Sequence, residues 1–136
     1  MTNSYDRLYH SFIIEQYKST RHRGILDQPD FDVHQTNPLC GDSIHLTGKL
    51  VDEPSGQRLI MRFEAKGCVI SQASATIVLD QCAKMTFEQI RAVQPRTVLE
   101  WLGMQVGPTR QRCVLLIFDA VQQGLVQLDQ KSESDR

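Results

Sequence analysis

The sequence has no excess of charge of either sign and no apolar run long enough to cross a bilayer. Its 15 Lys and Arg residues are balanced by 16 Asp and Glu residues, which gives a net charge of −1. Proteins that bind nucleic acid or an anionic membrane surface through charge carry a basic excess. A membrane-spanning helix needs about 20 consecutive apolar residues. We therefore expect neither nucleic acid nor a membrane as a partner.

The N-terminal segment lacks the features of a secretory signal. Residues 1–6 contain no basic stretch and lead into no short apolar core of the signal-peptide kind, and the early acidic residues Asp6 and Glu15 argue against an organellar transit peptide. These features predict a cytoplasmic protein, in which the four cysteines stay reduced. Reduced cysteines are expected to be metal ligands, nucleophiles or core residues rather than disulfides.

The length and composition fit one globular domain without internal repeats. The chain has 136 residues, of which 40% are apolar and 23% are charged; both fractions are ordinary for a domain with its own core. We expect a single domain over residues 1–136. Residues 127–136 are polar, and they are predicted to form a flexible tail.

Hydrophobic periodicity predicts both helices and strands. Apolar residues at three- and four-residue spacing predict a first helix from Ser4 to Ser19, and strict alternation predicts strands elsewhere. The polar side of one strand carries His45, which is expected to be exposed rather than a ligand. The predicted strands cover residues 31–36, 42–50 and 58–66, the last two forming a hairpin, and the later helices cover residues 69–82, 87–93, 95–103 and 109–125.

The segment Asn37-Pro38-Leu39-Cys40-Gly41-Asp42 concentrates reactive side chains. Residues two apart in an extended chain point to the same side, so the Cys40 thiol and the Asp42 carboxylate are expected to face one point. Gly41 leaves room for a ligand to approach, and Pro38 stiffens the chain before it. A converging thiolate and carboxylate suit a metal ion or sulfur chemistry.

Two further cysteines are expected at the ends of secondary-structure elements. Cys68 and Cys113 each lie near a predicted helix N-terminus, where free N–H groups and the helix dipole stabilise a thiolate. Cys82 lies at the far end of its helix and is predicted to be a core residue. Three thiolates with Asp42 suit a tetrahedral zinc ion or a small iron–sulfur cluster. The spacing follows no CxxC pattern, so scattered structural cysteines are the alternative.

Three motifs in order make the chain resemble the IscU/SufU/NifU-N family of iron–sulfur cluster assembly proteins. Residues 37–42 match the NPxCGD motif of that family, and residues 67–74 match its GCxxSxAS motif. Residues 110–116 resemble the segment around its third cysteine, and residues 8–18 resemble its opening helix. The resemblance extends from about Leu8 to Leu125.

The resemblance implies an α+β fold, with a three-stranded antiparallel sheet packed against about five helices and three cysteines at one exposed end. It implies that Cys40, Asp42, Cys68 and Cys113 hold a zinc ion or an iron–sulfur cluster. It also implies a pyridoxal-phosphate cysteine desulfurase of the SufS or IscS type as partner. This desulfurase would deliver sulfur as a persulfide, with Cys40 and Cys113 as candidate acceptors. Apo iron–sulfur proteins would receive the cluster, and the protein is expected to be a monomer or a weak homo-oligomer.

The sequence combines features of two branches of that family. The IscU branch has a histidine before the third cysteine and an LPPVK segment read by a chaperone pair; here Arg112 and residues 106–110 occupy those places. A basic residue before the third cysteine resembles the SufU branch. The usual SufU insertion, however, has no room between Cys68 and Cys113.

Two functions of different classes follow from these observations. The first is a scaffold that accepts persulfide sulfur and iron and assembles a transient [2Fe–2S] cluster, with Asp42 as a labile ligand. The alternative is a zinc-dependent sulfurtransferase, an enzyme that activates the desulfurase and relays sulfur without holding a cluster. In that case Arg112 would contact the desulfurase or be merely solvated. A purely structural zinc site is the third interpretation.

Overall fold

The computed structural model describes residues 4–134 of the chain, with side chains from residue 10 to residue 132. The described residues form a three-stranded antiparallel sheet in the order β1-β2-β3, together with five helices. This confirms the predicted α+β architecture. The elements are, in order, α1 (Ser4–Lys18), β1 (Phe31–Asn37), β2 (Asp42–Glu53), β3 (Gly56–Lys66), α2 (Val69–Cys82), α3 (Phe87–Arg91), α4 (Pro95–Leu102) and α5 (Pro108–Ser134).

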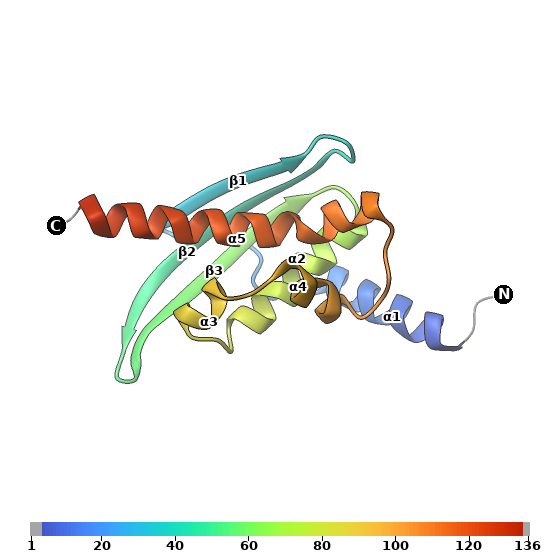
Figure 1. The fold of residues 1–136 in the computed structure, drawn as a ribbon, viewed down its shortest axis with the longest axis horizontal. Coiled ribbons are helices and arrows are strands. Elements are labelled where there is room, and N and C mark those ends of the chain that lie inside the picture. Colours follow the sequence, from blue (N-terminus) through green and yellow to red (C-terminus); the bar gives the residue numbers. More distant parts are fainter. Residues whose placement is uncertain (1–3, 135–136) are drawn as a thin grey trace.

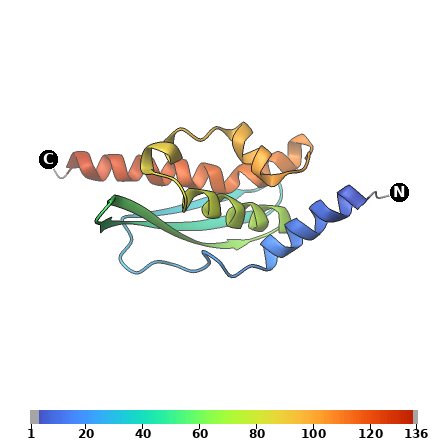
Figure 2. The same ribbon diagram turned by 90° about the horizontal axis from the view of Figure 1, so that it is seen from below.

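The two faces of the sheet are covered by different parts of the chain. Helices α2, α4 and α5 lie over one face, and the segment between α1 and β1 crosses the other (Figure 1, Figure 2). That segment is held to the sheet by its backbone N–H groups: the Gly24 N–H donates to the Phe63 carbonyl at 2.9 Å, and the Leu26 N–H donates to Oγ1 of the Thr47 side chain at 3.0 Å. Apolar residues at alternate positions of the strands face the helices and form the core.

Helix α5 approaches the sheet closely because two glycines leave space for one aromatic ring. Phe31 is 2% exposed and pairs with Gly48 on β2. A Cβ on Gly48 would overlap the Phe31 ring, and a Cβ on Gly124 of α5 would lie 2.6 Å from its Cε1 atom. Glycine inside a strand or a helix is unfavourable, so the ring that fills this space explains both glycines.

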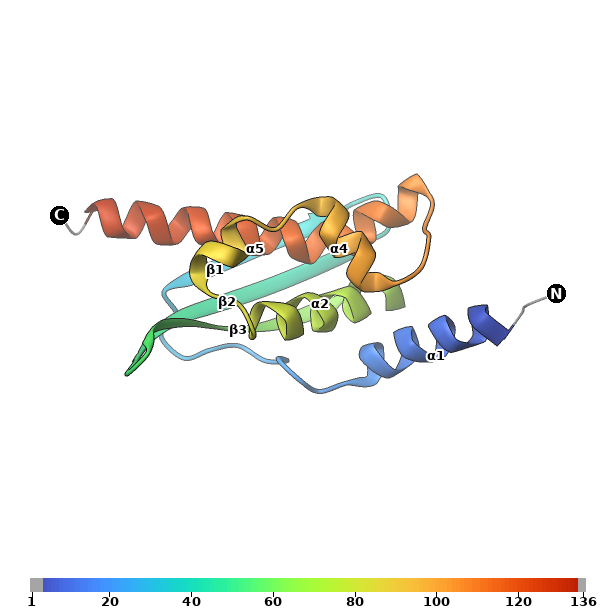
Figure 3. The same cartoon turned by 60° about the horizontal axis from the view of Figure 1, so that its bottom comes forward.

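Helix α1 lies beside α2 (Figure 3). Ile13 is buried at this contact, whereas Phe12 is 37% exposed, so not every apolar residue of this helix contributes to the core. The side chains of residues 4–9, where the predicted helix begins, lie outside the described residues. Arg21 donates to both carboxylate oxygens of Asp80 on α2, at 3.1 and 2.7 Å, which fixes the end of α1 to α2.

The short helices begin and end at residues that favour helix ends. Thr86 and Gln89 form a capping box at the start of α3. Gly103 ends α4 in the left-handed conformation, with φ of 79°. In the part of the chain that the structure describes, no helix has both the length and the apolar character needed to cross a membrane.

Helix α5 continues to Ser134, whereas the sequence predicted a flexible tail from Gln127. Leu128 is 6% exposed in the core, and Lys131 pairs with Asp30 at 3.0 Å. Asp129 accepts hydrogen bonds from Arg91. These polar residues have partners more than thirty positions away in the chain, so local composition does not reveal that they are ordered. Of the predicted tail, residues 135 and 136 lie outside the described residues.

Replacement of Gly48 tests the packing around Phe31. We expect Gly48→Ala to lower the free energy of unfolding by about 1–3 kcal/mol, because the new methyl group overlaps a buried ring. Gly107→Ala is the matched control, since a Cβ there meets nothing within 4 Å; it should change stability by no more than about 0.5 kcal/mol. Urea denaturation measures both, and equal costs would contradict the packing described.

Candidate metal centre

Three segments far apart in the sequence meet at one end of the molecule. The β1–β2 turn, the start of α2 and the start of α5 lie together there (Figure 1). Cys40 lies in the turn, Cys68 is the N-cap residue of α2, and Cys113 is in the second turn of α5. The fold therefore brings the three cysteines of the predicted site to the same end.

The Cys40–Asp42 segment is a tight turn rather than the predicted extended stretch. Asn37 pairs with Asp42 across the β1–β2 hairpin, so the chain reverses within four residues. The Cys40 N–H donates to the Asn37 carbonyl at 3.1 Å, and Gly41 has φ of +71°, which glycine adopts without strain. The turn leaves Cys40 exposed, and Leu39 beside it is 69% exposed.

Two of the cysteines and the aspartate form a compact group of potential ligands. The Cys113 thiol lies 3.5 Å from the Cys40 sulfur. These two sulfur atoms and a carboxylate oxygen of Asp42 all lie within 4.8 Å of one another. In a tetrahedral zinc site with Zn–S bonds of about 2.3 Å, two sulfurs are separated by about 3.8 Å. The group therefore needs only small side-chain movements to surround one ion.

Cys68 joins this group through Asp42. Its sulfur lies 3.6 Å from Asp42 Oδ2, and its backbone N–H donates to Asp42 Oδ1 at 2.8 Å. The Ser71 N–H donates to the Cys68 sulfur at 3.4 Å, so this sulfur caps α2. As predicted, Cys68 is at a helix N-terminus, where N–H groups stabilise a thiolate.

Gly67 makes the position of Asp42 possible. Its φ is +119°, and a Cβ there would lie 2.7 Å from the Asp42 Cα atom. Only glycine therefore allows β2 and the start of α2 to come this close. Asp42 is 1% exposed, and burial of a charged group is costly without close partners.

Burial dominates the chemistry of Cys113. The residue is 2% exposed, and this burial is the main cause that raises the pKa of its thiol far above the ordinary value; the adjacent Asp42, Cys40 and Cys68 raise it further. The sequence predicted the opposite, a thiolate favoured by the helix dipole. The dipole effect is confined to the first turn of a helix, whereas Cys113 is in the second turn and inside the core.

Cys82 lies apart from the group as a core residue, as predicted. It is 4% exposed, and burial raises the pKa of its thiol to about 12. The hydroxyl groups of Ser71 and Ser74 each bond to a backbone carbonyl. The Ser71 hydroxyl donates to the Cys68 carbonyl at 3.1 Å, and the Ser74 hydroxyl donates to the Val114 carbonyl at 2.6 Å, which joins α2 to α5.

Asn37 is a polar neighbour of the group that sequence reasoning did not assign. The residue is 6% exposed, and its Nδ2 atom donates to the Cys113 sulfur at 3.7 Å. The signal was available in the alternation of β1, since residues at odd positions from Phe31 to Asn37 point to the helix-covered face. Arg112, next to Cys113, is exposed.

The donor set fits a metal ion. Three thiols and one carboxylate are the ligands of zinc and of iron–sulfur centres, and a cation among them would offset the burial of Asp42 and replace the thiol protons. When bound, zinc stabilises the thiolate form of the cysteines that ligate it.

Comparison with known proteins gives the same family as the motifs. Residues 8–135 match the model of the NifU-like N terminal domain. The chain belongs to the NifU-like N-terminal domain family. The crystal structure of a nitrogen-fixing NifU-like protein (N-terminal) from Brucella abortus superposes on 93% of this NifU-like domain and 97% of its own chain, with a TM-score of 0.71 at 22% identity. That similarity shows the fold.

Two relatives resemble shorter parts of the NifU-like domain. The zinc-dependent sulfurtransferase SufU of Bacillus subtilis is 40% identical over 73 residues, which cover 54% of this chain and 47% of SufU. The iron–sulfur cluster assembly scaffold protein IscU of Thermotoga maritima is 36% identical over 83 residues, covering 61% of this chain and 56% of IscU. The match thus spans about half of each relative.

A pair of glycine variants tests the close contact between Gly67 and Asp42. Gly67 and Gly56 both have a positive φ, but a Cβ on Gly56 meets nothing within 4 Å. Both alanine variants carry the same backbone strain, so the difference between them isolates the crowding of Asp42. We expect Gly67→Ala to cost about 1–3 kcal/mol more than Gly56→Ala in urea denaturation of the metal-free protein. Equal costs would show that Asp42 is free to move away.

Proposed function

We propose that this protein is an iron–sulfur cluster assembly scaffold that accepts persulfide sulfur from a cysteine desulfurase. Cys40, Cys68, Cys113 and Asp42 hold a [2Fe–2S] cluster as cargo and release it to apo iron–sulfur proteins. The observation that carries the proposal is the convergence of three thiols and a buried carboxylate from three separate segments. Membership of the NifU-like family supports it.

The ligand set suits temporary rather than permanent holding. A carboxylate binds iron less strongly than a soft thiolate does, so Asp42 is the ligand that exchanges first. Cys40 lies in an exposed turn, whereas Cys113 and Asp42 are buried. The cargo would therefore enter and leave on the Cys40 side.

The same difference in exposure favours Cys40 over Cys113 as the first sulfur acceptor. The Cys40 thiolate attacks the terminal sulfur of the desulfurase persulfide, and a new S–S bond forms at Cys40. The S–S bond of the donor breaks, and the desulfurase cysteine leaves as a thiolate. Cys113, 3.5 Å away, is the next sulfur that could receive the atom.

The second candidate function is a zinc-dependent sulfurtransferase. The similarity to SufU favours it, together with the exposed Arg112 beside Cys113, where a desulfurase could be contacted. Zinc at the same four residues would keep the thiols ionised. Cys40 would then relay sulfur without a cluster being held.

Anaerobic reconstitution separates these two functions. The protein is incubated with a cysteine desulfurase, cysteine and ferrous iron, and its metal and acid-labile sulfide are measured before and after. The scaffold predicts iron and sulfide in near-equal amounts that pass to an apo-ferredoxin. Retained zinc, no sulfide and a desulfurase rate that rises only with the zinc form would instead establish the sulfurtransferase.

Removal of the Asp42 carboxylate tests the labile ligand. We expect the cluster on Asp42→Ala to persist several-fold longer and to transfer more slowly, because the exchangeable oxygen ligand is lost. The visible absorption of the cluster measures both its lifetime and its transfer. Asp42→Asn is the control for folding, since its amide oxygen still accepts the Cys68 N–H. Transfer should slow in both variants, and stability should fall more in Asp42→Ala. Transfer kinetics equal to wild type in both would exclude this role.

A further inference from the structure

We propose that Asp32, His34 and His45 form a second metal site, on the sheet face that the helices leave uncovered. The three ligand atoms, one from each side chain, lie within 4.8 Å of one another. The ligand would be a borderline divalent transition-metal ion such as zinc or ferrous iron. The inference does not depend on the cysteine group or on its proposed function.

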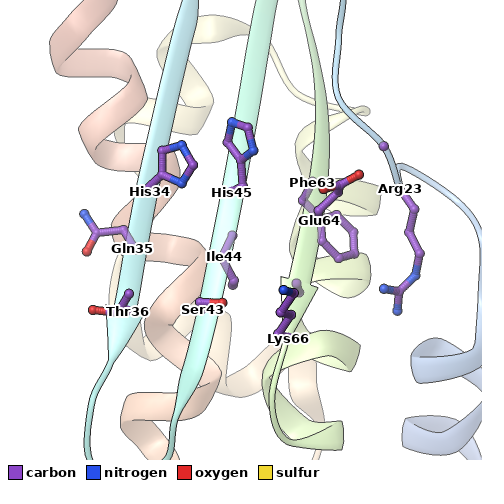
Figure 4. A pocket seen from close by; sticks show the side chains of 12 residues that line it. Arg23, His34, Gln35, Thr36, Ser43, Ile44, His45, Phe63, Glu64 and Lys66 are labelled. Atoms are coloured by element: carbon purple, nitrogen blue, oxygen red, sulfur yellow. The ribbon is translucent and has the colours of Figure 1, made fainter.

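Strand pairing places the three side chains together. His34 and His45 are direct partners across the β1–β2 ladder, and Asp32 lies two residues before His34, on the same face. The imidazole rings stack with centroids 4.0 Å apart and planes inclined by 18°. Figure 4 shows both rings on strands that lie in front of the helices. The pairing of β1 with β2 therefore places all three side chains together, and no loop residue takes part.

The distances suit a metal ion bound between these groups. His45 Nε2 lies 2.7 Å and His34 Nε2 lies 3.5 Å from the same oxygen, Asp32 Oδ1. Two ligands of a tetrahedral ion with bonds of about 2.0–2.1 Å are separated by about 3.3 Å, a value between the two observed distances. Two imidazoles and one carboxylate, with further positions open, are typical of zinc or ferrous iron, whereas calcium and magnesium prefer oxygen ligands.

The backbone of Asp32 is held in place by a side chain of α5. The Gln127 amide of α5 donates to the Asp32 carbonyl at 3.1 Å and accepts from the Asp32 N–H at 3.1 Å. These bonds occupy the free edge of β1 and hold Asp32 in place relative to His34. Fixed ligands reduce the cost of ordering a site when the ion binds.

The surroundings leave room for the remaining ligands of the ion. His34 is 70% and Asp32 is 51% exposed at the side chain, and His45 is 21% exposed, less than the sequence predicted. Both rings border a hollow of about 610 Å³ (Figure 4). Glu64, the partner of His45 on β3, lines the same hollow. Water or an acidic group can therefore complete the coordination.

Cobalt(II) distinguishes this site from the cysteine group. The 136-residue protein is first loaded with one equivalent of zinc to occupy its thiolates, and cobalt is then titrated in. Thiolate-bound cobalt has an intense near-ultraviolet charge-transfer band, whereas imidazole- and carboxylate-bound cobalt shows visible bands alone. We expect saturable uptake of one further cobalt ion with visible bands only. His34→Gln and His45→Gln should each weaken this uptake at least tenfold.

His10→Gln is the matched control, because His10 is an exposed histidine on α1, remote in sequence from these strands; it should leave the uptake unchanged. His34 is largely exposed, so the His34 variant is expected to fold. Cobalt uptake that is the same in wild type and in the His34 and His45 variants, or that appears only with the charge-transfer band, would overturn the proposal.

Discussion

The contact between the Asp42 carboxylate and Cys68, the N-cap residue of α2, organises this molecule. Asp42 is 1% exposed, and its carboxylate accepts the Cys68 N–H at 2.8 Å and also lies beside the Cys68 thiol. It ties the second strand of the sheet to the helix that follows the third. The contact is possible because Gly67 has no side chain, and a buried charge needs such partners. The same carboxylate is thus both a structural link and the oxygen of the candidate metal centre.

Packing between α5, α2 and the sheet brings the other candidate ligands close to Asp42. Phe31 fits between Gly48 and Gly124 and sets α5 close against the sheet. The Ser74 hydroxyl holds α2 to α5 through the Val114 carbonyl, one residue from Cys113. Cys113 is consequently buried, while the tight β1–β2 turn presents Cys40 to solvent. One protected and one accessible thiol at 3.5 Å are a suitable arrangement for receiving a sulfur atom and retaining it.

The fold could be predicted from the sequence because each helix and strand has a local pattern of residues. Alternation in residues 42–50 and 58–66 specified two strands, and apolar residues at three- and four-residue spacing specified the first helix. Sequence reasoning failed where distant contacts decide the outcome. The polar residues after Gln127 are helical because Arg91 and Asp30 lie opposite them. Cys113 is buried because α5 begins one turn before it. The pairing of His45 with His34 and Asp32 depends on the β1–β2 register, which side-chain periodicity alone does not fix.

X-ray absorption of the protein loaded with one equivalent of zinc tests the central claim, that the four residues bind one ion together. We expect three sulfur ligands at about 2.3 Å and one oxygen ligand at about 2.0–2.2 Å, with one sulfur fewer in Cys68→Ser and an unchanged spectrum in Cys82→Ser. Fewer than three sulfurs in the wild-type protein, or imidazole scattering at this single equivalent, would contradict the account.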